Sequence, residues 1–333
     1  MHAIEARQLV RKFGEVTAVA GVDFDVAQGE VFGFLGPNGA GKSTTINMLC
    51  TMLRPSAGTA TINGYDVRTD PGGVRRSIGI IFQDASLDDR LTARENLKFH
   101  AMLYDIPSDV FRQRSAELLA MVDLTDKADD QIRGYSGGMK RRLEIARGLL
   151  HHPKVLFLDE PTIGLDPQTR RHIWQYLLKL REQEGVTMFM TTHYMDEAEH
   201  CDRIAIIDHG RIVALDAPPQ LKALVGGDVI AVRTSDNERA TARLRESEGV
   251  ETRPGPDGQL IVETPQGDRF IPLLIDRLAS GQPPITVASI NLSRPTLEDV
   301  FIKLTGHAIR AGEADGVQAF RQMARMWTGG RRR

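Results

Sequence analysis

Short apolar runs in the first two thirds of the chain predict strands of a parallel sheet. They occupy Glu30–Leu35, Ser77–Phe82, Lys154–Glu160 and Val186–Thr192. A nearly continuous apolar run is typical of a strand whose two faces are both buried, as in parallel sheets. Lys154–Glu160 is the clearest case, because four apolar residues in a row are followed directly by two carboxylates.

The segments between these runs have the periodicity of helices. Apolar residues recur every three or four positions in Thr44–Leu53, Thr92 to about Asp123, Lys140–Leu150 and Arg170–Glu182. Strands that alternate with helices indicate an α/β fold built on a parallel sheet.

The start of the chain has a different pattern. Residues up to about Gln28 predict short strands and turns, with one strand over Ala6–Val10. Asn63-Gly64 is a further turn signal.

The last third of the chain predicts a separate small domain. Gly226-Gly227 marks the boundary, and strands or helices follow over Asp228–Thr234, Asn237–Glu248, Val250–Arg253, Leu260–Thr264, Arg269–Ala279 and Ile285–Asn291. That order is β-α-β-β-α-β, a ferredoxin-like plan. Leu297–Leu304 predicts one more short helix, and residues 307–333 predict a basic tail without fixed structure. We therefore expect domains at 1–225 and 226–306.

Composition adds few constraints. Of 333 residues, 41% are hydrophobic and 26% charged, as in ordinary globular proteins, and the net charge of −2 suggests no nucleic-acid partner. The two cysteines imply no disulfide framework, which fits a reducing cytoplasm. Residues 1–7 lack the apolar core of a signal peptide, and no apolar run approaches the roughly 18–20 residues of a membrane span. Work at a membrane would need another chain to supply the span.

Candidate chemistry begins with a phosphate-binding loop at Gly36-Pro37-Asn38-Gly39-Ala40-Gly41-Lys42-Ser43-Thr44. The glycines let backbone N–H groups turn inward, and the following helix start adds positive potential where phosphates would sit. Lys42 can reach the β- and γ-phosphates, and the Ser43 hydroxyl can bind Mg²⁺. A chance glycine-rich turn is the alternative, but the strand before and the helix after argue against it.

Three further stretches carry weaker signals. Asp159 and Glu160 end an apolar strand. A solvated strand end is the plain alternative, but the phosphate loop upstream favours a Mg²⁺ site in which Asp159 would hold the metal and Glu160 would polarise a water. Ser136-Gly137-Gly138 opens a helix and could approach a phosphate, yet it also suits any loop. A lone histidine is more often a packed or solvated side chain than a catalyst, but the place of His193 at a strand end favours a catalytic role.

The ordered set is more specific than its parts. The phosphate loop, Gln83, Ser136-Gly137-Gly138, Leu158-Asp159-Glu160, Asp166 and His193 resemble the motifs of ATP-binding-cassette (ABC) ATPases over about residues 4–222. The signature differs from the usual Leu-Ser-Gly-Gly-Gln at Tyr135 and Met139, although its phosphate-contacting centre is kept. The ending Ser293–Phe301 through Gly306 looks like the C-terminus of daunorubicin-resistance-type exporter ATPases.

The resemblance implies a P-loop ABC ATPase domain with a mixed sheet core and a helical subdomain, binding ATP and Mg²⁺. It implies that Phe13 stacks on adenine in place of the usual tyrosine, and that Gln83 contacts Mg²⁺ and the attacking water. Asp159 would support Mg²⁺, Glu160 would act as general base, and His193 would contact the γ-phosphate. Ser136, Gly137 and Gly138 would bind the γ-phosphate of ATP held by a second copy, and Asp166 would lie in the loop crossing that interface.

By the same resemblance, two copies form a homodimer with two composite sites. The dimer would work with a separate transmembrane permease on the cytoplasmic face of the membrane and export drugs or other amphipathic compounds. An exporter of lipid, polysaccharide or ions remains an alternative. A soluble ABC protein of ribosomes or DNA fits less well, because such chains carry two cassettes, a long coiled coil or zinc modules. A regulator with little turnover is disfavoured by the intact Glu160 and His193.

Overall fold

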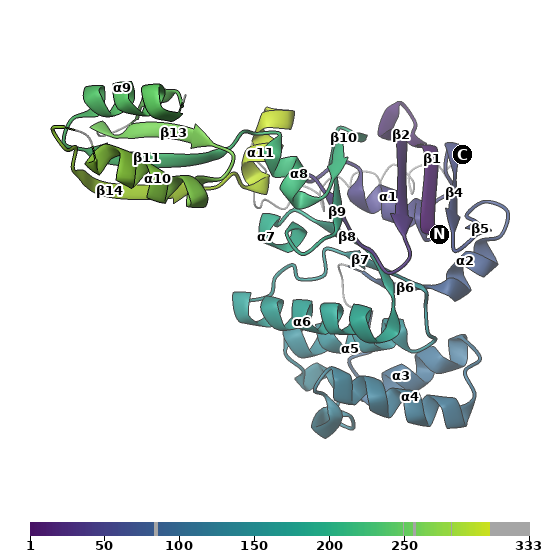
Figure 1. Ribbon diagram of the computed structural model, residues 1–333. Coiled ribbons are helices and arrows are strands. Elements are labelled where there is room, and N and C mark those ends of the chain that lie inside the picture. Colours follow the sequence, from purple (N-terminus) through teal and green to yellow (C-terminus); the bar gives the residue numbers. More distant parts are fainter. Residues whose placement is uncertain (83–85, 249, 256–257, 281, 307–333) are drawn as a thin grey trace, which may run out of the picture. The chain divides into compact units, whose positions relative to one another are not determined.

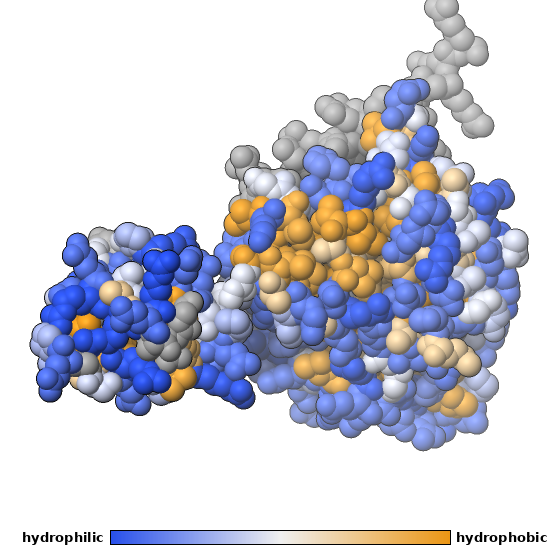
Figure 2. Space-filling view, turned by 45° about the horizontal axis from the view of Figure 1, so that its top comes forward, coloured by the Kyte–Doolittle hydropathy of each residue, from blue (hydrophilic) through white to orange (hydrophobic). Residues whose placement is uncertain are grey.

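The computed structural model describes residues 1–82, 86–248, 250–255, 258–280 and 282–306 (Figure 1). Contacts between Cα atoms divide the chain into two compact units, and the second begins at Pro218. Among the described residues, no helix combines the length and apolar character needed to cross a membrane. Most of the surface seen in Figure 2 is hydrophilic, with a large apolar area on the larger unit and smaller apolar spots elsewhere.

The first unit contains two sheets. The antiparallel sheet has the order β2-β1-β4-β5, and its strands are β1 (His2–Phe13), β2 (Val16–Ala27), β4 (Ala57–Ile62) and β5 (Tyr65–Asp66). The second sheet has the order β10-β9-β3-β8-β7-β6 and is parallel apart from β10. Its strands are β3 (Val31–Leu35), β6 (Ile78–Ile81), β7 (Val155–Asp159), β8 (Thr187–Thr192), β9 (Arg203–Asp208) and β10 (Arg211–Asp216). This is the mixed sheet expected for the cassette.

Helices complete the first unit. They are α1 (Lys42–Leu49), α2 (Pro71–Ser77), α3 (Ala93–Leu103), α4 (Ser108–Met121), α5 (Gly137–Leu149), α6 (Pro167–Glu184) and α7 (Met195–Ala198), with 3₁₀ turns at Thr125–Lys127 and Ile132–Gly134. In Figure 1, α3, α4, α5 and α6 gather on one side of the unit, while α1 lies near β1 and β2. The helices α3 to α6 therefore form a group apart from α1, as expected for the helical subdomain.

The core joins the two sheets. Phe24 from β2 packs against Phe32, Phe34 and Phe189 with ring centroids 5.7 Å apart, and Phe157 lies 5.5 Å from Phe189. All residues of β3, β7 and β8 are buried, which explains their continuous apolar sequences. Such close packing fixes the carboxyl ends of β3, β7 and β8, where the candidate residues lie.

Some element ends differ from the prediction. β1 runs over 12 residues rather than Ala6–Val10, because pairing with both β2 and β4 carries it past exposed polar positions and an irregularity near Gln8. α1 starts at Lys42 rather than Thr44, since Gly41 in the left-handed region acts as its N-cap. It ends at Leu49, before Thr51, which also has positive φ. The Asn63-Gly64 turn is confirmed, with φ of 50° and 82° joining β4 to β5.

The second unit is one antiparallel sheet with two helices packed on its core. In chain order it contains α8 (Pro218–Ala223), β11 (Asp228–Thr234), α9 (Asn237–Glu248), β12 (Thr252–Pro254), β13 (Leu260–Thr264), α10 (Gly267–Ala279), β14 (Val287–Ser293) and α11 (Leu297–Thr305). The sheet order is β12-β13-β11-β14. Its core includes Ile230, Val262, Leu244 and Leu274, and α8 contacts α11.

Candidate functional site

The phosphate loop links β3 to α1 and is shaped by its glycines. Gly39 has φ of 82° and Gly41 has φ of 108°, which side chains rarely adopt. At Gly36, a Cβ atom would lie 2.4 Å from the carbonyl oxygen of Ile207, so only glycine fits there. Gly36 and Ala40 are buried, whereas Asn38 and Gly39 are exposed. The loop is thus packed at its base and open at its tip, as a ligand-binding turn must be.

Lys42 turns back over this loop. Its Nζ donates to the carbonyl oxygens of Gly36 at 2.8 Å and Pro37 at 3.2 Å, and it lies 3.5 Å from Oε1 of Glu160. The side chain is 5% exposed. Burial lowers the pKa of the Lys42 ammonium, and the neighbouring Glu160 carboxylate partly opposes this shift.

Asp159 ends β7 and lies beside the first residues of α1. Its Oδ1 accepts from Thr191 Oγ1 at 2.6 Å and from Ser43 Oγ at 3.2 Å. Burial raises the pKa of the Asp159 carboxyl against these two hydrogen bonds, and the adjacent Glu160 charge adds to the rise. An acidic and a hydroxyl oxygen are therefore held side by side, although they are 116 residues apart in sequence.

Glu160 follows Asp159 with a left-handed backbone, φ 47°. Its N–H donates to Thr191 Oγ1 at 3.1 Å, and its Oε1 lies 3.3 Å from His193 Nδ1. Burial acts to raise the pKa of the Glu160 carboxyl, but His193 and the Lys42 ammonium outweigh it and hold that pKa below its usual range. Glu160 is thus a buried carboxylate that stays ionised beside two basic groups.

Other predicted residues lie elsewhere. Phe13 ends β1 and is half-buried, with the guanidinium carbon of Arg11 4.5 Å from its ring centroid. Gln83 lies outside the described residues. Thr44, in the first turn of α1, is half-buried. Asp166 caps α6 by accepting from the N–H groups of Gln168 and Thr169, both at 3.0 Å.

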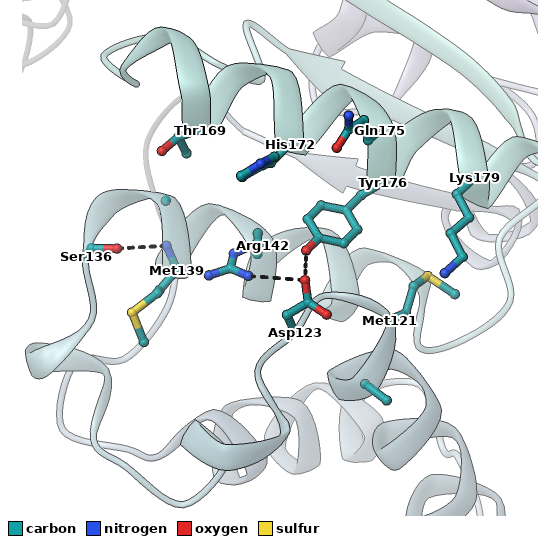
Figure 3. Close-up of a pocket in the computed structure, with 12 residues that line it drawn as sticks. Met121, Asp123, Ser136, Met139, Arg142, Thr169, His172, Gln175, Tyr176 and Lys179 are labelled. Atoms are coloured by element: carbon teal, nitrogen blue, oxygen red, sulfur yellow. Dashed lines mark hydrogen bonds and ion pairs between the residues drawn. The ribbon is translucent and has the colours of Figure 1, made fainter.

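Ser136-Gly137-Gly138 forms the exposed start of α5. Ser136 Oγ accepts from the N–H of Met139 at 3.2 Å, so the predicted N-cap is confirmed. No hydrogen bond or ion pair joins these three residues to the phosphate loop within the described part of the chain. Ser136 and Gly138 border a pocket of about 580 Å³ between α5 and α6, which Figure 3 shows with Arg142, His172 and Tyr176 around it.

A magnesium ion would find few protein ligands in this arrangement. The residues that the structure describes hold no group of three or more His, Cys, Asp or Glu side chains able to bind a metal. The pair Ser43 and Asp159 nevertheless fits Mg²⁺, which typically takes one or two protein oxygens and completes its shell with phosphate and water.

Two further residues of the site were not predicted from the sequence. Thr191 contacts both Asp159 and the backbone of Glu160, and its only sequence signal is a polar residue at the end of an apolar strand. Arg141 is 6% exposed, and its Nε donates to the carbonyl oxygen of Pro161 at 2.5 Å. An arginine in a basic amphipathic helix gives no sequence signal of such burial.

Comparisons with known proteins agree with this geometry. The family described as ABC transporter matches residues 19–163. The daunorubicin/doxorubicin resistance ATP-binding protein DrrA of Streptomyces peucetius is 42% identical, with 92% of this chain and 93% of that protein covered. The chain belongs to the ABC transporter family. The linearmycin resistance ATP-binding protein LnrL of Bacillus subtilis is another relative, 36% identical, with 92% of this chain and 99% of that protein covered.

Solved ABC structures resemble the chain as well. The dimeric ATP-binding cassette MJ0796, in a post-hydrolysis state bound to ADP and Pi, has a TM-score of 0.59 and 29% identity, covering 64% of this chain and 98% of its own. The ABC protein cbiO1 from Clostridium perfringens has a TM-score of 0.63 and 27% identity, covering 74% of this chain and 96% of its own. As a member of this family, the chain is a nucleotide-binding ATPase.

Proposed function

We propose that this chain is the ATP-hydrolysing subunit of an exporter that moves drugs or other amphipathic compounds through a separate membrane permease. The observation that carries the proposal is the convergence of Lys42, Asp159, Glu160 and His193 beside the phosphate loop. The proposed substrate class rests on relatives named for daunorubicin, doxorubicin and linearmycin resistance. The subunit would sit on the cytoplasmic face of the membrane through its permease.

Each site residue has a role in this proposal. Lys42 and the backbone from Gly36 to Thr44 bind the ATP phosphates, and Ser43 with Asp159 holds Mg²⁺, which neutralises phosphate charge when bound. Glu160 takes a proton from the attacking water, a role supported by its ionised carboxylate. His193 donates to the γ-phosphate, and Phe13 stacks on adenine. Gln83 stays a prediction for Mg²⁺ and water contact.

The signature acts on the nucleotide of a second copy. Ser136, Gly137 and Gly138 are exposed or half-buried and free of contacts to their own phosphate loop among the described residues, which supports a role across a dimer interface. MJ0796 has been solved as a dimer. Two-fold symmetry then gives two composite sites from one phosphate loop and one signature per chain.

The second unit has a ferredoxin-like plan in this proposal, supported by its element order and by the sheet order β12-β13-β11-β14. We assign it a structural or regulatory role. The proposed limits of the two domains are 1–225 and 226–306, with a basic tail at 307–333. No cluster able to hold a metal lies in its described residues.

The transport proposal is tested by expressing the chain with a polytopic membrane protein encoded next to it, in a host sensitive to doxorubicin. The expected result is co-purification of the two chains and reduced doxorubicin accumulation. Glu160→Gln is the matched control, since it keeps the complex but stops turnover. Accumulation that falls equally with the Glu160→Gln variant would show that ATP hydrolysis by this chain does not drive the export.

A further inference from the structure

The side chains of Arg141, Glu144 and Arg147 on α5 bind the described backbone before and after the segment 83–85. Arg141 Nη1 donates to the carbonyl oxygen of Phe82 and to Glu144 Oε2, the latter at 3.0 Å. Glu144 Oε1 in turn accepts from the N–H of Ser86 at 2.8 Å. Arg147 Nη1 donates to the carbonyl oxygen of Ser86 at 2.6 Å. Phe82 and Ser86 are the described residues next to that segment, so α5 binds both of these residues.

The same arginine reaches the turn that carries Glu160. Arg141 Nε donates to the carbonyl oxygen of Pro161 at 2.5 Å, and its Nη2 lies 3.4 Å from the carbonyl oxygen of Glu160. The N–H of Glu160 is held on its other side by Thr191. Glu160 has a φ of 47°, a left-handed conformation that a residue with a side chain keeps only where its surroundings hold it there. Arg141, which binds the carbonyl oxygens, and Thr191, which binds the N–H, together fix this conformation.

Burial makes these contacts strong and specific. Arg141 is 6% exposed and Glu144 is 1% exposed. An arginine presents five N–H donors in a flat fork, so it can bind several carbonyl oxygens at once, which a lysine ammonium cannot do in the same geometry. The fork joins the end of β6, the turn after β7 and the helix that begins at Ser136-Gly137-Gly138.

We propose that Arg141 is a positioning residue for ATP hydrolysis, which locks the Glu160 turn to α5 so that the reactive carboxylate and the signature move as one body. This inference rests on the proposed role of Glu160 as the base. Arg141 touches neither nucleotide nor water in this account. It acts through the backbone of Glu160 and Pro161, and therefore affects the rate of the chemical step more than nucleotide binding.

The test is Arg141→Lys in the full-length chain, which keeps the positive charge beside Glu144 but removes the fork. The control is Arg114→Lys on α4, because Arg114 is equally buried and forms a bidentate pair with Glu184 at 2.7 and 2.9 Å. Steady-state ATP hydrolysis gives kcat and KM, direct titration gives nucleotide affinity, and urea unfolding gives stability. The same substitution is also made in the Glu160→Gln background.

The proposal predicts that Arg141→Lys lowers kcat about tenfold or more while KM and ATP affinity change less than about twofold. Arg114→Lys should lose similar stability but keep kcat within about twofold of wild type. In the Glu160→Gln background, Arg141→Lys should lower the residual rate by less than about twofold, because the carboxylate it positions is gone.

Two results overturn the inference while leaving the proposed function intact. One is an Arg141→Lys kcat within about twofold of wild type. The other is a parallel loss of affinity, stability and rate in both arginine variants, which would indicate folding support alone. A wild-type chain that fails to hydrolyse ATP, or a Glu160→Gln variant as fast as wild type, refutes the proposed function first and this inference with it.

Discussion

The Lys42 ammonium lies 3.5 Å from Oε1 of Glu160, and both side chains are almost fully buried. The same ammonium donates to two carbonyl oxygens of its own loop. Its charge is therefore balanced by protein groups at the place where the phosphates of a nucleotide would bring their own negative charge. Nucleotide binding must exchange some of these contacts for phosphate contacts, so Lys42 contributes to affinity as well as to charge neutralisation.

We predict that Lys42→Ala weakens ATP binding about 10- to 100-fold, the usual loss for charge-assisted hydrogen bonds of about 1.5–3 kcal/mol. Isothermal titration with ATP and Mg²⁺ measures the effect. Lys154→Ala is the control, because Lys154 is an exposed lysine just before β7. Equal affinity of Lys42→Ala and wild type would refute the phosphate-loop assignment.

Thr191→Val removes the 2.6 Å hydrogen bond to Asp159 without changing side-chain volume much. Because that bond holds the Asp159 pKa down, its loss raises the pKa further and weakens Mg²⁺ binding. We expect half-maximal ATPase rate at about three- to tenfold higher Mg²⁺ concentration, with a larger shift at lower pH.

Thr187→Val on the same strand is the matched control for Thr191. Thr187 Oγ1 accepts from the N–H of Gly29 at 2.9 Å, and the residue is 2% exposed, so a buried hydrogen bond is lost at the other end of β8. Thr187→Val loses this one hydrogen bond and about 1 kcal/mol of stability, whereas Thr191→Val also loses the bond from the Glu160 N–H and should lose about 1–2 kcal/mol. Only Thr191→Val should change the Mg²⁺ requirement. If the two variants require the same Mg²⁺ concentration, Thr191 has no role in Mg²⁺ binding.

Glu197 predicts a pH dependence of stability. Burial raises the pKa of this carboxyl to about 7, against hydrogen bonds from Thr162 and Thr192. Between pH 4.5 and 7 the folded chain binds a proton that the unfolded chain releases, so wild-type stability falls as pH rises through this window. Glu197→Gln removes this titration. The free energy of unfolding of the variant, minus that of wild type, should therefore rise by up to about 3 kcal/mol from pH 4.5 to pH 8.

Urea unfolding at several pH values measures this difference. Glu184→Gln is the control, because the Arg114 guanidinium holds the pKa of Glu184 below its usual range. The loss of unfolding free energy caused by Glu184→Gln should therefore stay constant between pH 5 and pH 8. A Glu197→Gln effect that is equally flat over that range would mean that Glu197 stays ionised in the folded chain.

The division at Pro218 predicts how the chain tolerates truncation. A chain ending at Ala217 should fold and bind ATP with near-wild-type affinity, since every described candidate residue precedes that point. A chain ending at Gly226 keeps α8 without α11, exposing Leu221, which is 1% exposed in the full chain. We expect it to aggregate more in light scattering. A soluble 1–217 chain that binds no ATP would place part of the nucleotide site in the second unit.

Local sequence was enough to predict the elements whose signals are local. The phosphate loop, the Ser136 N-cap and the buried strand before Asp159 each depend on residues within a few positions, and β11, α9 and β13 have the predicted limits. Contacts between distant segments could not be predicted this way. Thr191 meets Asp159 only because β7 and β8 are neighbours in the sheet, and Arg141 is buried only because α5 covers the ends of β6 and β7.

The most direct test of the account is the ATPase rate of Glu160→Gln beside wild type, with ATP affinity measured on the same preparations. Glutamine keeps the size of the side chain and one acceptor oxygen but cannot accept the proton from the attacking water. The account predicts a loss of about 100-fold or more in kcat, with ATP affinity retained. A Glu160→Gln variant that hydrolyses ATP at the wild-type rate would contradict it.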